Sequence, residues 1–363
     1  MWIVTSSPRA LITSLVRSTN TSEPPASGFS RSRHDRYSTR IGAPACSPFI
    51  PARLLVPFVR DRFGSPVRVT GSRTGGVPIP RSRCEACGHA VQPWTLGSSV
   101  LGRCTHCGHL VRSLHDAPAH HREHAYGGDP TLDSARLALT YRTLVADGVP
   151  ESVFEIGFGT GALLRRFLDG GASVAGADPD QLELAVDDRV AREGSLHACR
   201  IEDVTPDALP AGAVDMAYGI HVLEHVVDPA LTLQRTRDLL RPGGSAHFLT
   251  PAGDWAGLGL VKDGWWMLED PTHIRFFTAN SLSTMARDAG FDSVEIRRPV
   301  LDSLVHGAAS TVRAVRPADR PRGVLAQRST MALAALGLPG TLAARAAVPR
   351  LRPTLHLVAR VAS

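Results

Sequence analysis

The chain of 363 residues is long enough for two or three domains, and its 43% apolar and 20% charged residues provide a sizeable core and exclude wholesale disorder. It contains no run of the ~18 apolar residues that a membrane-spanning helix needs, and its first 20 residues lack the apolar core of a secretory signal. The net charge of +6 comes from the two ends, because residues 149–300 carry 13 basic and 23 acidic residues and would repel a nucleic acid. We expect a cytoplasmic protein with no specific nucleic-acid partner, and composition leaves the oligomeric state open.

Residues 1–80 contain 33 Arg, Ser or Pro residues and show no sustained hydrophobic period, so we expect a disordered extension there. A compact cysteine module over residues 81–112 follows. Residues 113–148 then form a polar, His-rich link and a leading helix predicted over 132–147. The rest of the chain, residues 149–363, is expected to be a single larger domain.

The cysteine module has two pairs, Cys84-x2-Cys87 and Cys104-x2-Cys107, separated by 16 residues. This is the spacing of a four-thiolate zinc site, and Gly88 and Gly108 directly after the pairs permit the tight turns that such knuckles require. Four thiolates leave no open coordination position for water. The sequence therefore predicts a structural Zn²⁺ ion bound by Cys84, Cys87, Cys104 and Cys107.

Strand and helix patterns alternate from residue 152 onward. Strands are predicted over 152–156, 173–177, 198–201, 214–220, 245–249 and 293–297, and helices over 162–168, 181–192, 230–240 and 279–289. Arg241-Pro-Gly-Gly244 is read as a breaker between a helix and a strand. The alternation predicts a mostly parallel sheet with helices on both faces, which binds ligands beyond the carboxyl ends of its strands.

The C-terminal region, residues 301–363, combines an expected helical insertion over about 301–354 with a last strand over 355–361. Its Ala/Leu-rich run, residues 331–347, should be broken at Pro339-Gly340. The run is too short and interrupted to cross a bilayer. Packing against the domain is the expected role, and weak contact with a membrane surface or an apolar substrate is the alternative.

A glycine-rich turn, Glu155-Ile-Gly157-Phe-Gly159-Thr-Gly161, joins the first strand of the domain to its first helix. Glycines let a ligand approach the backbone, and a helix N-terminus offers free N–H groups. Asp178 ends the next strand, where a carboxylate can accept hydrogen bonds from a ribose diol. The turn also fits the dinucleotide fingerprint, so by itself it leaves the cofactor open.

Further motifs follow in order along the chain: Asp203 after the third strand, His221-Val-Leu-Glu-His225, Leu240-Arg-Pro-Gly-Gly244 and Thr272-His-Ile-Arg-Phe-Phe-Thr278. With the glycine turn, this ordered set resembles the class I S-adenosylmethionine-dependent methyltransferases, and an upstream zinc-ribbon-like knuckle pair is similar to that of bacterial members. The resemblance implies a Rossmann-like sheet of seven strands whose last strand is antiparallel. It implies S-adenosyl-L-methionine as the cofactor, with binding residues Glu155, Gly157, Gly159, Gly161, Asp178, Pro179 and Asp203.

The segment His221-x-x-Glu224-His225 also matches an inverted zinc-protease motif, but it straddles a strand end and a loop, whereas that motif requires one helix. Related O-methyltransferases bind a divalent ion through Glu-x-x-Glu-His, and His221 replaces the first of those carboxylates. Methyl transfer needs in-line positioning, and a base is useful only for an acceptor such as a hydroxyl. His221, His225 and His273 are the candidate catalytic bases, with helix capping or a buried structural role as the alternative for each.

Aromatic residues near the fifth strand (Trp255, Trp265, Trp266, Phe276 and Phe277) either line an apolar acceptor pocket or pack over the sheet edge. Together the motifs predict methyl transfer to a small molecule: a natural product, a sugar, or a lipid or quinone-like compound. The acceptor atom, oxygen, carbon or nitrogen, is left open. The alternatives are an RNA methyltransferase that uses the zinc module, an NAD(P)-dependent oxidoreductase that uses the same turn, and a non-catalytic scaffold.

Overall fold

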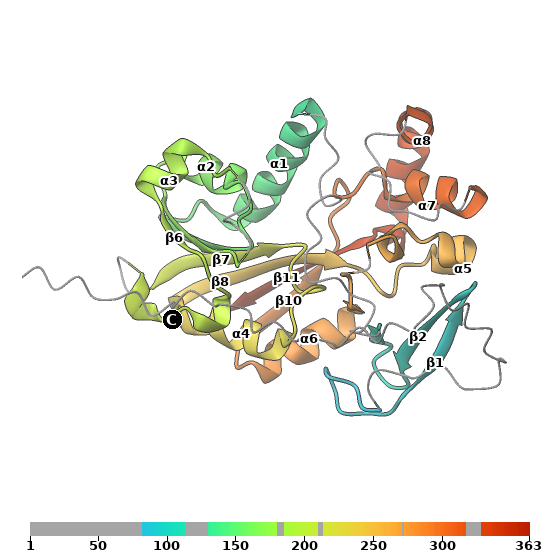
Figure 1. Ribbon diagram of the computed structural model, residues 1–363, viewed down its shortest axis with the longest axis horizontal. Helices are drawn as coiled ribbons and strands as arrows, with labels where there is room; N and C mark the ends of the chain where they lie inside the picture. The colour runs from blue at the N-terminus through green and yellow to red at the C-terminus, as the bar shows by residue number, and fades with distance from the viewer. Residues whose placement is uncertain (1–81, 113–129, 180–184, 210–212, 271, 317–327) are drawn as a thin grey trace, which may run out of the picture. The chain divides into compact units, whose positions relative to one another are not determined.

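The computed structural model describes residues 82–112, 130–179, 185–209, 213–270, 272–316 and 328–363. The predicted extension over residues 1–80 and the histidines of the link (His115, His120, His121 and His124) lie outside the described residues. The described part contains a large mixed sheet covered by helices and a small second sheet that carries the cysteines (Figure 1).

The seven strands of the large sheet lie in the spatial order β10-β11-β8-β7-β4-β5-β6. Their bounds are β4 (Ser152–Ile156), β5 (Ser173–Ala177), β6 (Ser195–His197), β7 (Val214–Ile220), β8 (Leu240–Pro251), β10 (Ser293–Arg297) and β11 (Thr354–Arg360). β11 runs antiparallel to both of its neighbours, whereas the pairs from β8 to β6 are parallel. The predicted seven-stranded Rossmann-like sheet with an antiparallel last strand is confirmed.

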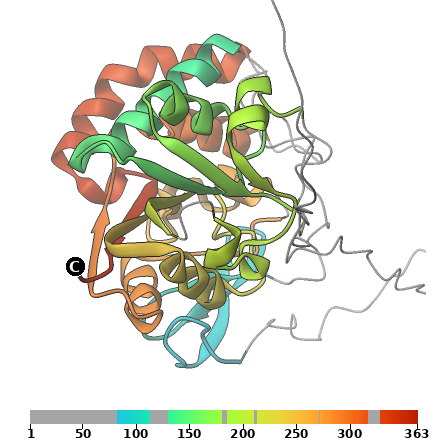
Figure 2. The same ribbon diagram turned by 90° about the vertical axis from the view of Figure 1, so that its left-hand side faces the viewer.

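Helices cover both faces of this sheet (Figures 1 and 2). One face carries α1 (Pro130–Leu144), α2 (Ala162–Asp169) and α3 (Asp188–Glu193), and the other carries α4 (Pro229–Asp238) and α6 (Ala279–Asp288). Because both faces are covered, the central strand β4 is buried along almost its whole length, as expected for a parallel sheet. Phe167 and Tyr218 fill the core on the α2 face, and Phe154 and Phe248 fill it on the α4 face.

Side-chain caps set the starts of the two helices that follow β7 and β9. Asp228 accepts a hydrogen bond from the backbone N–H of Leu231 at 3.0 Å, with Pro229 in the first turn of α4. Thr278 and Ser281 form a reciprocal capping box at the start of α6. These caps fix where the chain turns back from the carboxyl edge of the sheet.

The cysteine module forms an antiparallel sheet in the order β1 (Val91–Leu96), β2 (Ser99–Cys104), β3 (Leu110–Val111) and β9 (Arg275–Phe276). The last of these strands belongs to the large domain: Leu110 pairs with Phe276 and Val111 with Arg275. The buried residues of the module and those of the α4 face form one continuous core. The module is therefore joined to the large domain through both backbone pairing and packing.

The region after β10 contains α7 (His306–Val315) and α8 (Arg328–Ala347), which pack on each other beside the short helix α5 (Leu258–Val261) (Figure 1). The predicted break at Pro339-Gly340 is wrong, because α8 continues through Pro339. Arg345 near its end is buried and donates hydrogen bonds to the carbonyls of Val300, Asp302 and Ser303, which anchors this half of the helix. The described helices all lack the length or the apolar composition that crossing a bilayer requires.

Three other local predictions differ from the structure. The helix predicted over 181–192 begins only at Asp188, because the Asp187 carboxylate caps it by accepting from the N–H groups of Arg189 and Val190; residues 181–184 lie outside the described part. The third strand lies earlier than predicted, at Ser195–His197. The breaker at 241–244 lies inside β8, where a bulge in the pairing with β7 accommodates it.

Candidate functional site

The glycine turn follows β4 at the point where the crossover connections leave in opposite directions, with β5 on one side of β4 and β7 on the other. Open α/β sheets bind ligands at such a switch point. Gly157, Gly159 and Gly161 have φ values of 73°, 52° and 71°, in the left-handed region that favours glycine. A Cβ on Gly157 would lie 2.9 Å from a methyl group of Val222, so the turn also needs glycine for space.

Glu155, the last but one residue of β4, is buried beneath this turn and is 5% exposed. One carboxylate oxygen accepts a hydrogen bond from the Tyr218 hydroxyl at 3.1 Å. Burial, together with the charge of nearby Asp178, raises the pKa of Glu155 well above its usual value, although the Tyr218 hydrogen bond opposes this shift. A cationic group placed near the carboxyl would therefore favour its ionised form strongly.

Asp178, directly after β5, is 7% exposed and accepts a hydrogen bond from the backbone N–H of Gly159 at 2.7 Å. This bond ties the carboxyl end of β5 to the glycine turn. Pro179 follows it and is exposed. Asp203, in a 3-10 turn after β6, has a side chain that is 48% exposed and lies 3.6 Å from the Arg200 guanidinium. The structure thus places Glu155 and Asp178 together at the turn and Asp203 at the nearby surface.

The end of β7 holds a pair formed by a partly exposed histidine and a buried glutamate. His221 has a left-handed φ of 56°, a strained value for a non-glycine residue and one that recurs at functional sites. Its Nδ1 lies 3.0 Å from one oxygen of Glu224, and the other oxygen accepts a hydrogen bond from the Thr250 hydroxyl at 3.0 Å. Glu224 is fully buried, whereas the His221 side chain keeps 26% of its surface exposed. A carboxylate thus orients an accessible imidazole, the arrangement of a general base and its partner.

The electrostatics of the pair follow from this contact. Burial alone would raise the pKa of Glu224, but the hydrogen bond and charge of His221 lower it to about 2. Burial would lower the pKa of His221, but the hydrogen bond and charge of Glu224, aided by Asp302, raise it above its ordinary value against the opposing charge of Arg136. Both members of the pair are therefore stabilised in their charged forms.

His225 and His273, the other two candidate bases, lie beside the pair with ring centroids 4.7 Å apart. His225 contacts the Thr272 hydroxyl through Nδ1 at 2.9 Å, and Nδ1 of His273 donates to the carbonyl of Met267 at 2.7 Å. Ligand atoms of Glu224, His225 and His273 lie within 4.8 Å of one another, close enough to surround a cation. Both oxygens of Glu224 are engaged by His221 and Thr250, so the cluster is already a hydrogen-bonded network.

Four of the five aromatic residues predicted near the fifth strand are buried in the core, and Trp266 is partly buried against it. Trp265, Phe276 and Phe277 are fully buried and Trp255 is 8% exposed. The indole N–H of Trp265 donates to Nε2 of His306 at 3.2 Å, which joins this cluster to α7. The structure therefore favours the second of the two predicted roles, packing over the sheet edge.

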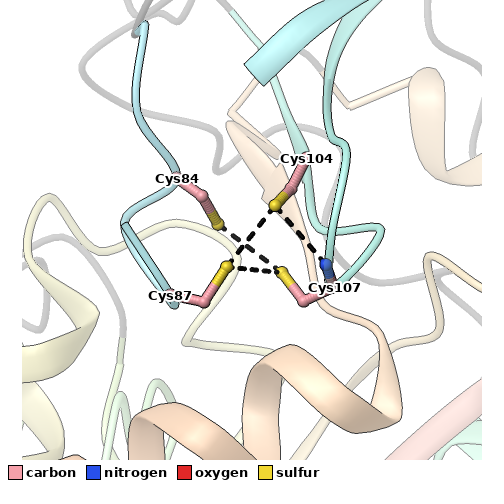
Figure 3. Close-up of side chains that lie close together, drawn as sticks. All are labelled: Cys84, Cys87, Cys104 and Cys107. Atoms are coloured by element: carbon pink, nitrogen blue, oxygen red, sulfur yellow. Dashed lines mark hydrogen bonds between the residues drawn. The ribbon is translucent and has the colours of Figure 1, made fainter. Parts of the chain in front are cut away.

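The four cysteines converge from two turns, with all four sulfur atoms facing one another (Figure 3). The Sγ–Sγ distances are 3.4 Å for Cys87–Cys107, 3.5 Å for Cys87–Cys104 and 3.6 Å for Cys84–Cys107. Four sulfurs at ~2.3 Å from a tetrahedral Zn²⁺ ion would be separated by ~3.8 Å, so the cluster fits zinc after a slight expansion. Backbone N–H groups of Ala86 and His106 point at the sulfurs of Cys84 and Cys104, which stabilises thiolate charge.

A buried ionic network that was not predicted from the sequence joins the cysteine module to the large domain. Glu85, inside the first cysteine pair, accepts hydrogen bonds from Nε of Arg275 at 2.7 Å and Nε2 of His109 at 2.9 Å. Both charged side chains are almost fully buried, at 6% and 2% exposure. No periodicity links residues so far apart, and the only available signal was the position of Arg275 within a motif of the resemblance.

Comparison with known proteins identifies the family of the domain. A family model described as a methyltransferase domain matches residues 120–296. The ubiquinone biosynthesis O-methyltransferase of Cupriavidus pinatubonensis is 32% identical over 177 residues, covering 46% of this chain and 71% of that protein. The enzyme of the same name from Ralstonia nicotianae is 30% identical over 170 residues, with 44% and 71% covered.

The fold, the glycine turn and the matched domain define the chain as a methyltransferase. It belongs to the class I S-adenosylmethionine-dependent methyltransferases. Among solved structures, phosphoethanolamine N-methyltransferase 2 of Haemonchus contortus with S-adenosyl-L-methionine has a TM-score of 0.42 at 17% identity, covering 67% of this chain and 55% of that one. Family membership decides the meaning of the glycine turn in favour of S-adenosyl-L-methionine over a nicotinamide cofactor.

Proposed function

We propose that this enzyme transfers a methyl group to a hydroxyl oxygen of a small aromatic, quinone-like acceptor. The observation that carries the proposal is the His221–Glu224 pair at the end of β7, because a positioned base is useful for an acceptor that holds its proton tightly. Two relatives that the chain matches at 30–32% identity are named for O-methylation in ubiquinone biosynthesis, which supports both the oxygen and the class of acceptor.

The cofactor residues fit S-adenosyl-L-methionine by their donor and charge chemistry. We assign the buried Glu155 carboxyl to the amino group of the methionine part, since a cation there would offset the cost of its burial. Gly157, Gly159 and Gly161 would line the methionine part. Asp178, already oriented by the glycine turn, would accept from the ribose diol, with Pro179 against the adenine and Asp203 at its edge.

S-adenosyl-L-methionine, when bound, would supply a methyl group carried by a positively charged sulfur. The leaving group would be a neutral thioether, so no general acid is needed. Nδ1 of His221 donates to Glu224, which leaves Nε2 with a lone pair to accept the hydroxyl proton of the acceptor. Glu224 stabilises the imidazolium that forms. His225 and His273 would shape the acceptor side of the network, with His273 held neutral because burial lowers its pKa.

We also propose a division of the chain into a zinc-ribbon-like module at 81–112, a link and leading helix at 113–148, and a catalytic domain at 149–363 with an insertion near 301–354. Cys84, Cys87, Cys104 and Cys107 would hold one structural Zn²⁺ ion. A closed four-thiolate site supplies folding energy and offers no position for a substrate.

The test is a methyl-transfer assay of the purified full chain with S-adenosyl-L-methionine and alkylated dihydroxybenzenes, followed by mass spectrometry. The expected result is a product heavier by one methyl group on oxygen, and loss of that product in His221→Gln with unchanged affinity for S-adenosylhomocysteine. Methylation of carbon or nitrogen instead, or full activity of His221→Gln, would contradict the proposal. Binding and methylation of RNA with no activity on the aromatic panel would favour the nucleic-acid alternative.

A further inference from the structure

We propose that Glu85 is a positioning residue for methyl transfer: through Arg275, it fixes the loop at residues 222–227 that carries Glu224, and thereby links the cysteine module to the catalytic pair. This inference rests on the proposed function for its consequence in catalysis. The structural link itself is independent of that function and can be measured separately.

The first step of the link is the position of Glu85 within the knuckle. It lies between Cys84 and Cys87, and the turn around it is closed by a hydrogen bond from the N–H of Gly88 to the carbonyl of Cys84 at 2.9 Å. Its carboxylate accepts hydrogen bonds from Arg275 and His109. A knuckle fixed by metal therefore also fixes where this carboxylate is presented.

The second step is the set of acceptors around Arg275. Its guanidinium, held at Nε by Glu85, donates to the carbonyl of Leu223 at 3.0 Å, to that of Val226, and to that of Val227 at 3.2 Å. One buried side chain thus gathers three carbonyls of the same loop. Arginine suits this role because its planar fork of donors is rigid and always charged.

The third step connects the loop to the base. Glu224 lies between the carbonyls that Arg275 binds, and its own carbonyl accepts from the N–H of Ile274 at 3.0 Å. The carboxylate of Glu224 then reaches His221 at 3.0 Å. Because hydrogen bonds weaken steeply with distance and angle, a small shift of the loop would misalign the pair.

The charges explain why Glu85 is needed in addition to the carbonyls. Arg275 is 2% exposed, and the carbonyls that it binds carry only partial charge, so the carboxylate adds a charge-assisted hydrogen bond that they do not supply. Glu85 is the carboxylate that touches it among the ion pairs of the described residues. Removal of that carboxylate takes away the 2.7 Å charge-assisted hydrogen bond at Nε, so the guanidinium loses a contact that fixes its orientation toward the loop.

The experiment compares Glu85→Gln with Asp263→Asn in the full-length, zinc-loaded protein. Asp263 is the matched control because it also joins the module to the large domain, accepting from the N–H and hydroxyl of Ser98 at 2.9 and 2.6 Å, but it does not contact the loop. Zinc content, affinity for S-adenosylhomocysteine, turnover as a function of pH, and hydrogen exchange of residues 222–227 are measured for each protein.

For Glu85→Gln we expect full zinc content, unchanged affinity for S-adenosylhomocysteine, faster exchange in the loop, and turnover lower by about 10-fold or more, the loss typical of a misplaced charge-assisted hydrogen bond. The acidic limb of the pH profile should move toward lower pH, since a displaced Glu224 no longer raises the pKa of His221. The other charged or titratable groups around His221 are Asp302, Arg136, His273 and His306. Asp263→Asn should show none of these changes.

Unchanged loop exchange in Glu85→Gln would overturn the inference, as would loss of zinc and cofactor affinity together with turnover, because that pattern indicates a merely structural role. If Glu85→Gln does not fold, Arg275→Lys replaces it as the test variant, because lysine keeps the positive charge but lacks the planar guanidinium. Hydrogen exchange in Arg275→Lys must then be faster at residues 222–227. If His221→Gln keeps full activity, the proposed function fails while the exchange result still decides the link.

Discussion

Replacing Glu224 by glutamine removes the negative charge that orients His221 and leaves a side chain of nearly the same shape. The lost interaction is a hydrogen bond of 3.0 Å between a carboxylate and an imidazole that must become cationic during proton transfer. Hydrogen bonds to charged groups contribute about 1.5–3 kcal/mol, which corresponds to a fall in kcat of about 10- to 150-fold. The loss increases further if the amide N–H₂ turns toward Nδ1, because Nε2 then carries the proton and cannot act as a base.

The assay is the pH dependence of kcat for wild type and Glu224→Gln, with Glu295→Gln as a control that removes an exposed carboxylate on β10. In wild type, kcat should rise with pH through the pKa of His221, which Glu224 holds above its ordinary value. In Glu224→Gln, the rise should occur at lower pH and reach a lower plateau. Equal plateaus and equal midpoints in the two proteins would refute the pairing of these residues in catalysis.

Three further predictions concern the cofactor turn, the metal and acid stability. Gly157→Ala should weaken the binding of S-adenosylhomocysteine, measured by calorimetry, about 10-fold or more. The reason is that Gly157 has a φ of 73° and an added Cβ would lie 2.9 Å from a neighbouring side chain. Gly148→Ala is the control: Gly148 also has positive φ but an added Cβ would meet no atom within 4 Å, so this variant should bind S-adenosylhomocysteine as wild type does. Metal analysis should find one zinc ion per chain, lost on strong chelation and in Cys104→Ser; full zinc in that variant would exclude the four-thiolate site. The pKa of Glu224 is lowered to about 2, so its contribution to the unfolding free energy is present above the ordinary pKa of 4.5 and disappears as the pH falls. The pKa of His221 is raised, so its contribution is present below the ordinary pKa of 6.5 and disappears as the pH rises. The advantage in unfolding free energy of wild type over Glu224→Gln should therefore be largest between these two values in denaturant titrations, and a constant difference from acid to alkaline pH would contradict it.

The sequence predicted those elements whose local signals agree with their tertiary setting. β4, β5, β7 and β10 begin and end at the predicted residues. The first three are short, mostly apolar segments bounded by turn residues, and β10 alternates polar and apolar residues. The helix before β6 was predicted to begin too early, because the hydrophobic period does not show that the Asp187 carboxylate caps the helix start. α8 passes through Pro339 because hydrogen bonds from Arg345 to a distant loop, absent from any local pattern, hold its second half.

The candidate site also contains residues that the sequence could predict and contacts that it could not. The glycine turn and Asp178 could be predicted because they are close in sequence and their order along the chain is fixed by the strands. The partnership of His221 with Glu224 depends on the backbone at the end of β7, where His221 has positive φ and brings its ring over the next turn. The contact between Glu85 and Arg275 joins residues 190 positions apart in the sequence, and only the folded chain brings them together.

Calorimetric titration of wild type and Asp178→Asn with S-adenosylhomocysteine tests the central claim, that the carboxylate after β5 and the glycine turn together hold the cofactor. We expect one site per chain in wild type and binding weaker by about 10-fold or more in Asp178→Asn, since the variant loses charge-assisted hydrogen bonds to both the ribose and the turn. Equal affinity in the two proteins, or no binding to wild type, would contradict it.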